Sequence, residues 1–281
     1  MLAVPRYAVF GHPVGHSLSP RLHAAFAVQT GVALEYTAID APPERFAEIV
    51  HAHFNSDGRG ANVTLPDKRL AFELADTHTR VAQRVGVANV LTRLPDGRIE
   101  AHNTDGTGLV RDLRERHCVA LRGARVLLLG AGGAAQATAW ALLDEGVDEL
   151  VIANRTTARA LALSDALAQP RHVCVSEWNA LGRSGSFDLI LNATSAGVRG
   201  DALPLPSSLF RAGSFACDLA YGAAALPFIA WAREAGARMA IDGLGMLAET
   251  AADSFERWHG VRPGTDAALH VLREAADQAR K

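Results

Sequence analysis

Residues Arg125–Ala137 read RVLLLGAGGAAQA, and the fold of the chain is deduced outward from this stretch. Its four apolar residues, Val126–Leu129, are typical of a strand buried on both faces of a parallel sheet. The turn Gly130-Ala131-Gly132-Gly133-Ala134 follows, and the Ala-rich segment Gln136–Leu143 then predicts a helix. Strand, glycine turn and helix in this order form the context in which a G-x-G-x-x-(G/A) pattern indicates a dinucleotide site.

The small size of each key residue in this turn is explained by its role in binding a dinucleotide. Gly130 permits the tight turn, Gly132 lets the backbone approach a pyrophosphate, and Ala135 lets the helix pack closely on the strand. The free N–H groups at the start of the helix attract an anion. The alternative interpretation is a tight strand-to-helix turn that holds no ligand.

The next predicted strand, Glu149–Ala153, ends in Asn154-Arg155-Thr156-Thr157-Ala158-Arg159. NAD-binding folds place an acidic residue here to bind the ribose 2′-hydroxyl, and this segment has none. Arg155 and Arg159 occur instead, and the planar guanidinium is well suited to a phosphate. The sequence therefore predicts NADP(H) as cofactor; the alternative for both arginines is a solvated helix start.

Length and composition favour a globular chain of two domains. The 281 residues are 49% hydrophobic, and the net charge of -2 gives no electrostatic argument for a nucleic-acid or membrane partner. No apolar run approaches the ~20 residues of a membrane span, and the N-terminus lacks the apolar core of a secretory signal. We expect a monomer or homodimer.

The three cysteines, Cys118, Cys174 and Cys217, are far apart and form no CxxC pair, which predicts a reducing cytoplasm. His51 and His53 have metal-ligand chemistry, but no third ligand is evident nearby, so we predict no metal site.

Lysine usage is the unusual feature of the composition. Among 28 basic residues only Lys68 and the C-terminal Lys281 are lysines. Arginine stays protonated, whereas a lysine is able to exchange a proton. Lys68 is therefore a candidate acid–base group, with chance retention as the alternative.

The N-terminal half alternates short strands and helices. We expect strands at Tyr7–Phe10, Tyr36–Ile39 and Gly60–Pro66, helices at Arg21–Thr30, Pro43–Phe54, Ala71–Val81 and Leu109–His117, and a hairpin turn at Pro95-Asp96-Gly97. Polar side chains recur where these strands meet loops, at Ser17, Ser19, Asn62, Thr64, Lys68, Asn89 and Asp105. Open α/β sheets hold their ligands at such places. One of the two serines is also a candidate N-cap.

The C-terminal half continues the nucleotide-binding pattern. Helices are expected at Ala160–Ala168 and Pro227–Ala235 and a strand at Phe187–Leu191, with Thr194 close to the cofactor. We predict an α/β protein with a substrate-binding domain at 1–105, a doubly wound Rossmann domain at 106–241 and C-terminal helices at 242–281 that pack back on the first domain.

With these residues named, the chain resembles the shikimate dehydrogenase family over nearly its whole length. The matching motifs are Gly11-x-Pro13-x-x-His16-Ser17-x-Ser19-Pro20, Gly60-Ala-Asn62-Val-Thr64-x-Pro66-x-Lys68, Asn103-Thr-Asp105-Gly, Gly130-Ala-Gly-Gly-Ala, Asn154-Arg155-Thr156, Asn192-Ala-Thr194, Tyr221 and Asp242-Gly-Leu-Gly-Met246. Their number and order make the resemblance specific.

The resemblance implies NADP-linked interconversion of 3-dehydroshikimate and shikimate, a small cyclic hydroxy acid. It implies that Lys68 and Asp105 are the catalytic pair, with Lys68 as general acid or base and Asp105 orienting. Predicted substrate contacts are Ser17, Ser19, Thr64, Asn89, Asp105, Tyr221 and the position of Thr250. Predicted cofactor contacts are Gly130, Ala131, Gly132, Gly133, Ala134, Asn154, Arg155, Thr156, Arg159, Thr194, Leu219 and Gly243.

Three residues depart from the family pattern. Asp67 precedes the lysine where an aromatic residue or histidine is usual, Val90 replaces a hydroxyl residue, and Thr250 replaces a substrate-binding glutamine. Loss of a bond to a substrate hydroxyl changes discrimination by orders of magnitude.

Two alternatives therefore stay open. One is a paralogue that acts on quinate, an aminoshikimate or a related cyclic hydroxy acid. The other is a non-catalytic NADP-binding regulator. A short-chain dehydrogenase is excluded because its Tyr-x-x-x-Lys motif needs a tyrosine where Thr64 stands.

Overall fold

The computed structural model describes residues 4–201 and 203–278, which form two compact units. The first unit runs to Gly108 and resumes at Leu247, and the second spans Leu109–Met246. The chain crosses between them within two helices, α5 (Asp105–Arg111) and α9 (Leu244–His259). The division between the two units falls after Gly108 and after Met246, three and five residues beyond the domain boundaries that the sequence predicted at 105 and 241. No helix among the described residues is long and apolar enough to span a membrane.

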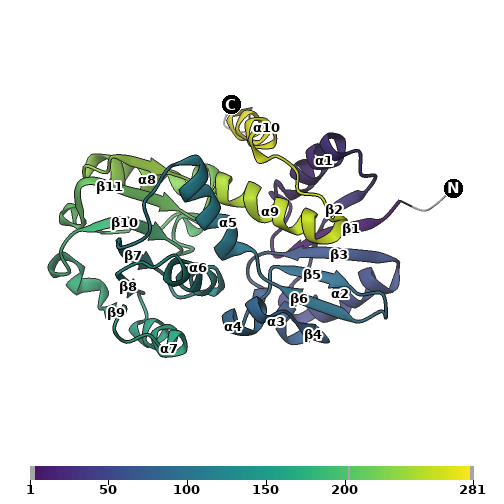
Figure 1. Ribbon diagram of the computed structural model, residues 1–281, viewed down its shortest axis with the longest axis horizontal. Helices are drawn as coiled ribbons and strands as arrows, with labels where there is room; N and C mark the ends of the chain where they lie inside the picture. The colour runs from purple at the N-terminus through teal and green to yellow at the C-terminus, as the bar shows by residue number, and fades with distance from the viewer. Residues whose placement is uncertain (1–3, 202, 279–281) are drawn as a thin grey trace. The chain divides into compact units, whose positions relative to one another are not determined.

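A mixed sheet of six strands, in the order β2-β1-β3-β5-β6-β4, forms the centre of the first unit (Figure 1). Its strands are β1 (Arg6–Gly11), β2 (Glu35–Asp40), β3 (Gly58–Val63), β4 (Thr77–His78), β5 (Val90–Arg93) and β6 (Ile99–His102). Strand β1 is parallel to β2 and β3, whereas β5 is antiparallel to both β3 and β6. The predicted hairpin between β5 and β6 is confirmed, with Gly97 at a positive φ of 90°.

Helices α1 (Ser19–Thr30), α2 (Phe46–Asn55), α3 (Lys68–Leu74) and α4 (Arg80–Val85) complete this unit, with α10 (Thr265–Gln278) after α9. Pro20 lies in the first turn of α1, as predicted, and Gly31 ends the helix in the left-handed conformation. The core under α2 joins Phe10 of β1 to Phe46 and Val50.

The single helix expected at Ala71–Val81 is wrong. Two short helices flank strand β4, and Thr77 and His78 pair with Glu100 and Ala101 of β6. The Thr79 side chain accepts a hydrogen bond from Ala82 N and so begins α4 as an N-cap. Pairing at the sheet edge, which periodicity does not reveal, interrupts the helix.

Two other boundaries also differ from the expectation. Strand β3 ends at Val63 rather than at Pro66. Helix α5 begins at Asp105, four residues earlier than the expected start at Leu109, and a π-helical turn, Asp112–Arg116, follows it. The earlier start places Asp105 in the first turn of a helix.

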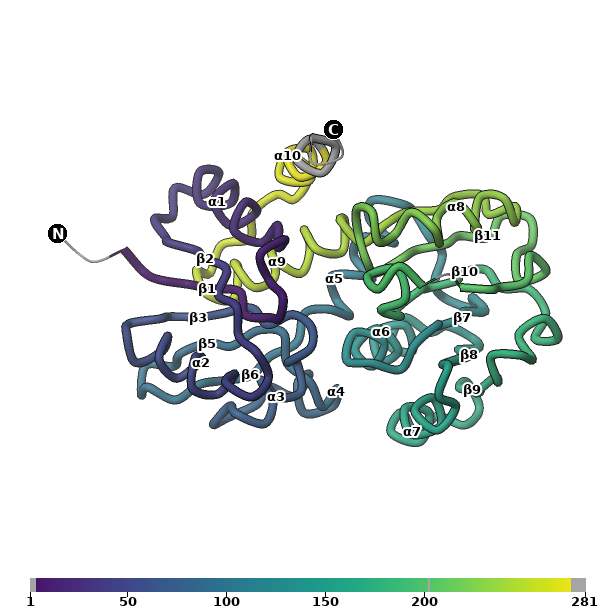
Figure 2. The backbone as a smooth tube through the Cα atoms, turned by 180° about the vertical axis from the view of Figure 1, so that it is seen from behind, coloured from purple at the N-terminus to yellow at the C-terminus, as the bar shows by residue number. Residues whose placement is uncertain are grey.

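The second unit confirms the predicted doubly wound Rossmann arrangement. Six parallel strands follow the order β12-β11-β10-β7-β8-β9, and Figure 2 shows β11, β10, β7, β8 and β9 in succession. They are β7 (Arg125–Leu129), β8 (Glu149–Ala153), β9 (Val173–Ser176), β10 (Phe187–Asn192), β11 (Phe210–Asp218) and β12 (Met239–Ile241). Helices α6 (Gly133–Asp144), α7 (Thr157–Leu167) and α8 (Leu226–Glu234) are their main crossovers.

Side chains of β7 alternate between two buried clusters. Val126 and Leu128 pack with residues of α6 and α7, whereas Leu127 and Leu129 pack with residues of α8. Both faces of the strand are therefore covered, which explains why its sequence is apolar without interruption.

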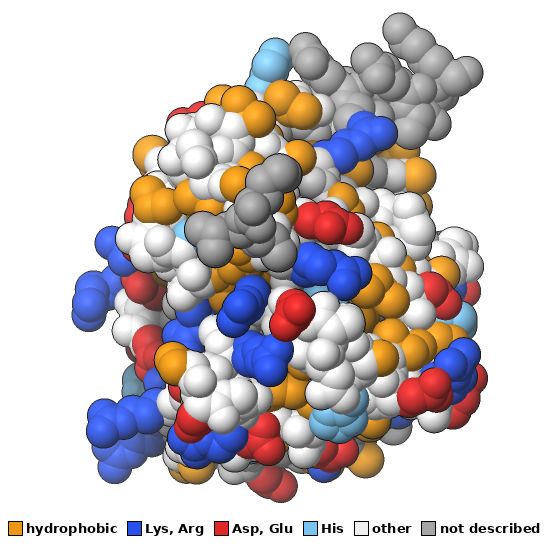
Figure 3. Space-filling model, turned by 90° about the vertical axis from the view of Figure 1, so that its right-hand side faces the viewer, with side chains coloured by type: hydrophobic (Ala, Val, Ile, Leu, Met, Phe, Trp, Pro, Cys, Tyr) orange, Lys and Arg blue, Asp and Glu red, His pale blue; other side chains and the backbone are white. Residues whose placement is uncertain are grey.

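Charges of both signs are interspersed on the face of the molecule shown in Figure 3. Ion pairs of the first unit such as Arg6–Glu35 and Arg45–Glu48 are largely exposed. Each such surface pair contributes little to stability.

Candidate active site

Strand direction brings the candidate side chains of the first unit to one edge of its sheet. The loops after β1 and β3 lie at the same edge because these strands are parallel. Strand β5 runs the opposite way and β6 reverses again, so the start of β5 and the end of β6 lie at this edge too. Ser19 follows β1, Lys68 follows β3, Asn89 precedes β5 and Asp105 follows β6.

Lys68 and Asp105 form a direct ion pair at this edge. Lys68 Nζ donates to Asp105 Oδ2 at 2.6 Å, and the two side chains are only 13% and 5% exposed. Asn89 Nδ2 donates to Asp105 Oδ1 at 2.8 Å. Both carboxylate oxygens are thus bound, and the charged pair is fixed where little water competes with it.

The lysine retains two N–H groups that are not used by Asp105. The described part of the chain offers these two groups no hydrogen-bond acceptor. Lys68 is the first residue of α3, and its carbonyl oxygen accepts a hydrogen bond from Ala88 N at 2.9 Å. A ligand oxygen at this edge could therefore accept a hydrogen bond from one of the two remaining N–H groups of Lys68.

Asn103 and Thr104 were part of a quoted motif but received no role in the sequence analysis. Asn103 Oδ1 accepts from the backbone N–H of Asp105 at 3.0 Å, and its Nδ2 donates to Val87 O. The backbone N–H of Thr104 donates to Asn89 Oδ1 at 2.9 Å. These bonds hold Asp105 and Asn89 in place, and the Asn-Thr-Asp spacing was the available signal.

Ser17 and Ser19 lie on the loop between β1 and α1. Neither residue occupies the N-cap position of α1, which is Leu18, although Ser17 Oγ accepts from the backbone N–H of Ser19 at 3.3 Å. Asp40 braces the loop by accepting from His12 Nδ1 at 2.9 Å and from Val14 N at 3.2 Å. Next to this loop, Thr64 N donates to Phe10 O, and the Thr64 methyl packs where a Cβ on Gly11 would stand.

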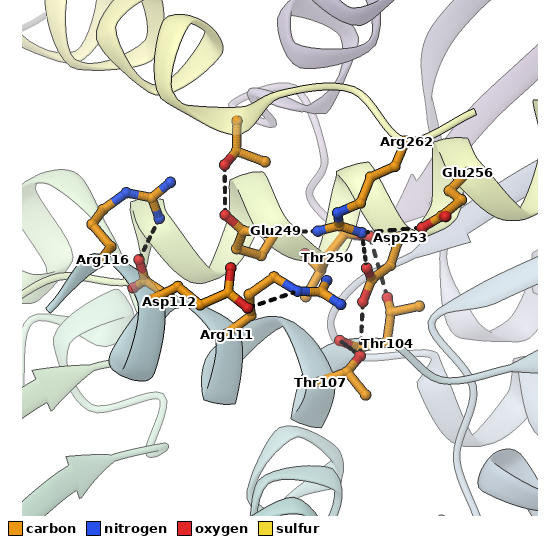
Figure 4. Close-up of polar contacts among 12 residues, drawn as sticks. Thr104, Thr107, Arg111, Asp112, Arg116, Glu249, Thr250, Asp253, Glu256 and Arg262 are labelled. Carbon is orange, nitrogen blue, oxygen red and sulfur yellow. Dashed lines mark hydrogen bonds and ion pairs between the residues drawn. The ribbon is translucent and has the colours of Figure 1, made fainter. Parts of the chain in front are cut away.

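Thr250 lies on α9 with its hydroxyl already engaged. Its Oγ1 donates to Leu247 O at 3.0 Å, and its methyl group leaves no room for a Cβ on Gly108 of α5. Figure 4 shows Thr104 and Thr107 directed toward α9, where they donate to Thr250 O and to Asp253. The two helices are therefore closely joined at Thr250.

Figure 4 also shows the arginine that anchors the segment beyond α9. Arg262 forms ion pairs with Glu249, Asp253 and Glu256, the first at 2.7 Å. Three carboxylates of one helix thereby share a single guanidinium.

The other two departures from the family pattern are both buried. Val90 is fully buried in β5. Asp67 is 1% exposed, and its Oδ2 has no hydrogen-bond partner among the described residues. Burial raises the pKa of the Asp67 carboxyl above its ordinary value. Tyr221, the remaining predicted substrate contact, follows β11 in the second unit.

In the second unit, the predicted cofactor contacts follow the carboxyl ends of five neighbouring strands. Gly130 comes after β7, Asn154 after β8, Thr194 after β10, Leu219 after β11 and Gly243 after β12. Because all these strands are parallel, the five positions share one edge of the sheet. The strand order reverses between β7 and β10, which is where such sheets bind nucleotides.

The glycine turn has the backbone that a pyrophosphate needs. Gly130 adopts a φ of 110°, and a Cβ there would stand 2.8 Å from Ala193 O. Gly132 is the N-cap of α6, and a Cβ added to it would meet nothing within 4 Å. Open space therefore lies at the N-terminus of a twelve-residue helix, a fitting place for an anion.

Arg155 follows β8 and Arg159 lies in the first turn of α7, and both are exposed. Within the described residues neither guanidinium has a hydrogen bond or ion pair. Nearby, Asn154 Nδ2 donates to Thr156 O at 2.9 Å. Two uncommitted guanidinium groups fit a 2′-phosphate, so the residues present suit NADP.

Asn192 and Asp218 fix the neighbouring loops, and sequence reasoning gave neither a role. Asn192 Oδ1 accepts from Thr194 N and Oγ1, and Asn192 Nδ2 donates to Asp218 Oδ2 at 2.7 Å. Burial raises the pKa of Asp218 to about 6. Gly243 packs against Leu219 so closely that a Cβ would collide with the Leu219 carbonyl.

Comparison with known proteins matches both units. Residues 9–91 match the family model described as shikimate dehydrogenase substrate binding domain, and residues 112–198 match the one described as shikimate / quinate 5-dehydrogenase. The chain is 54% identical over 274 residues to the shikimate dehydrogenase (NADP(+)) of Xanthomonas campestris pv. campestris, covering 97% of this chain and 96% of that protein. Identity to the Xylella fastidiosa enzyme of the same name is 52%, covering 96% of each chain.

A solved structure agrees with these sequence matches. The crystal structure of shikimate 5-dehydrogenase from Thermus thermophilus in complex with NADP(H) and shikimate aligns with a TM-score of 0.83. The identity is 32%, and the alignment covers 97% of this chain and 100% of that one.

Proposed function

Because the chain belongs to the shikimate dehydrogenase family, we propose that it catalyses the NADP-dependent interconversion of 3-dehydroshikimate and shikimate. The observation that carries the proposal is the buried Lys68–Asp105 pair, bound by Asn89 and directed by three strands to one sheet edge. An NADP-binding regulator would have no need of a proton-exchanging lysine held in this way.

When bound, NADPH would supply a hydride to the ring carbon bearing the reacting oxygen, and NADP+ would accept that hydride in the reverse direction. In the reducing direction, Lys68 Nζ donates a proton to that oxygen as it gains negative charge. In the oxidising direction, neutral Lys68 accepts the proton from the hydroxyl. Asp105 orients the amine through its 2.6 Å hydrogen bond.

The remaining predicted contacts divide by chemistry. Ser17 and Ser19 provide hydroxyl donors for the substrate carboxylate, and Thr64, Asn89 and Tyr221 provide partners for its other oxygens. The glycine turn receives the pyrophosphate of NADP, and Arg155 with Arg159 receives the 2′-phosphate.

Thr250 favours a second candidate substrate. The Thr250 hydroxyl donates to Leu247 O, and the side chain is too short to reach from α9 as far as a glutamine would. A paralogue acting on quinate, an aminoshikimate or a related cyclic hydroxy acid is the corresponding proposal. We place either enzyme in the cytoplasm, since the three cysteines are free thiols. A monomer or homodimer is the proposed oligomeric state.

The test is a steady-state panel of shikimate, quinate and related hydroxy acids, each with NADP and with NAD, read as cofactor reduction. The highest kcat/KM is expected for shikimate with NADP. A higher kcat/KM for quinate or an aminoshikimate would change the proposed substrate but not the proposed type of reaction. Tight NADP binding without reduction by any member would make the chain a regulator. Lys68→Ala is the matched inactive control.

A further inference from the structure

Tyr36 of β2 lies in an aromatic cluster that the proposed mechanism does not use. Its ring stacks on the imidazole of His23 with centroids 4.0 Å apart and planes 7° from parallel. His23 in turn contacts Phe255 and Trp258 of α9. Contacts with His23 of α1 and Trp258 of α9 leave the Tyr36 ring little freedom, so the position of its hydroxyl is well defined.

The Tyr36 hydroxyl donates to Asn62 Oδ1 at 2.7 Å. Asn62 Nδ2 donates to Asn89 O at 3.2 Å and to Ser254 Oγ at 2.8 Å. Ser254 Oγ donates to Thr250 O at 2.9 Å. The Asn62 amide thus joins β2, the residue before β5 and helix α9.

The direction of these bonds follows from their chemistry. Asn89 O is a backbone carbonyl and only accepts, so the Asn62 atom facing it is the NH₂ group. The amide oxygen therefore faces Tyr36, and the phenol has to be the donor. Burial raises the pKa of the Tyr36 phenol well above its ordinary value, so this proton is retained.

This network reaches the candidate site through Asn89. The phenol proton of Tyr36 is committed to Asn62. Asn89, whose carbonyl oxygen binds Asn62, uses its side chain to bind Asp105, which pairs with Lys68. A change at the phenol therefore reaches the catalytic pair through Asn62 and Asn89.

We propose that Tyr36 is a positioning residue for the substrate pocket: its phenol fixes the Asn62 amide, which holds Asn89 and Ser254 in the geometry that binds substrate. This inference rests on the proposed function for its kinetic readout. Its structural content, the dependence of Asn62 on the Tyr36 hydroxyl, stands independently of the substrate's identity.

The test is Tyr36→Phe, which removes the hydroxyl and keeps the stacked ring. Tyr7→Phe is the matched control, because Tyr7 stacks on Trp258 in the same cluster and its hydroxyl has no hydrogen-bond partner among the described residues. We expect Tyr36→Phe to raise KM for the hydroxy-acid substrate about ten-fold, as for one lost hydrogen bond. The KM for NADP should stay within two-fold, and Tyr7→Phe should behave as wild type.

A double-mutant cycle with Asn62→Ala separates positioning from general loosening. If the phenol acts through Asn62, the double variant should be no worse than Asn62→Ala alone. Additive losses, an equal rise in KM for NADP, or a Tyr36→Phe variant indistinguishable from Tyr7→Phe would overturn the proposal. If wild-type protein turns over no hydroxy acid, the proposed function fails; the cycle is then read from melting temperatures, where additivity still overturns the Tyr36–Asn62 link.

Discussion

The nucleotide edge of the second unit is made chiefly of backbone, whereas the substrate edge of the first unit is made of side chains. At the nucleotide edge, Gly130 packs against the Ala193 backbone and Gly132 leaves open space. Arg155 and Arg159 have no hydrogen-bond or ion-pair partner among the described residues. At the substrate edge, Lys68, Asp105 and Asn89 are already bound to one another before any ligand arrives.

This difference has consequences for mutation. A site made of backbone and uncommitted side chains tolerates loss of one side chain, because no protein partner is left unsatisfied. A site made of mutually bonded side chains does not, since each removal leaves a buried donor or acceptor without its partner. The five predictions below use that contrast, and they run from the largest expected effect to the smallest.

The largest effect is expected at Lys68. Lys68→Ala and Lys68→Arg should both lower kcat by roughly 10²–10⁴, because neither side chain exchanges a proton at neutral pH. Steady-state rates with NADPH and 3-dehydroshikimate measure this directly. A Lys68→Arg enzyme with near wild-type turnover would reduce the lysine to a positioning charge.

Arg155→Ala probes the backbone-built edge. We expect NADP affinity to fall by about 2 kcal/mol, the range of a lost charge-assisted hydrogen bond, and NAD affinity to stay nearly constant. Titrations of both cofactors against the variant give the two values, with wild-type melting temperature as the folding control. Equal losses for NADP and NAD would show that Arg155 is structural.

His23→Phe tests how pH changes the unfolding free energy of the first unit. Burial lowers the pKa of His23 to about 3 from 6.5, so below pH 6.5 the unfolded chain binds more protons and stability falls with falling pH. At pH 5 the loss is about 2 kcal/mol. His23→Phe should remove most of it, seen as a gain over wild type in unfolding free energy that is larger at pH 5 than at pH 7.5. A gain of equal size at pH 5 and at pH 7.5 would contradict this expectation.

In the second unit, Asp218 makes stability depend on pH in the direction opposite to that of His23. Its folded pKa of about 6 lies above the ordinary value of 3.8, so the folded state binds more protons between these values. Its contribution to stability therefore rises as the pH falls through 6. Hydrogen exchange that showed β10 and β11 losing protection as steeply as β1 and β2 on acidification would contradict this contrast.

Thr250→Gln has the smallest expected effect. A longer amide at this position should raise kcat/KM for shikimate about ten-fold, which corresponds to ~1.4 kcal/mol for one gained hydrogen bond. The closeness of Thr250 to Gly108 is the opposing influence. If the variant is worse and wild type already uses shikimate efficiently, the pocket is adapted to threonine.

The same contrast explains what the sequence revealed. The residues after β7 and β8 were placed correctly because a glycine turn and the residues beyond a strand are local patterns. The substrate edge could not be assembled by local rules: Asn62 binds Ser254, which is 192 residues away. Polar residues at strand ends marked most of its members as ligand candidates, but their roles came from the family resemblance, and Tyr36 and Asn103 received no role.

Errors in the element boundaries had the same origin. The helix expected at Ala71–Val81 was wrong because β4 pairs with β6, a contact between distant segments. Likewise, the start of α5 was predicted too late because the sequence around Asp105 is typical of a loop. In the structure, the backbone N–H of Asp105 donates to Asn103 Oδ1 at the start of the helix.

Binding of each ligand alone to two variants tests the central claim, that side chains of the first unit hold the hydroxy acid and strand ends of the second hold NADP. Calorimetry should show Asp105→Asn weakening shikimate about ten-fold or more while NADP affinity stays within two-fold. Arg155→Ala should show the reverse. A folded variant of either kind that weakens both ligands equally would contradict the account.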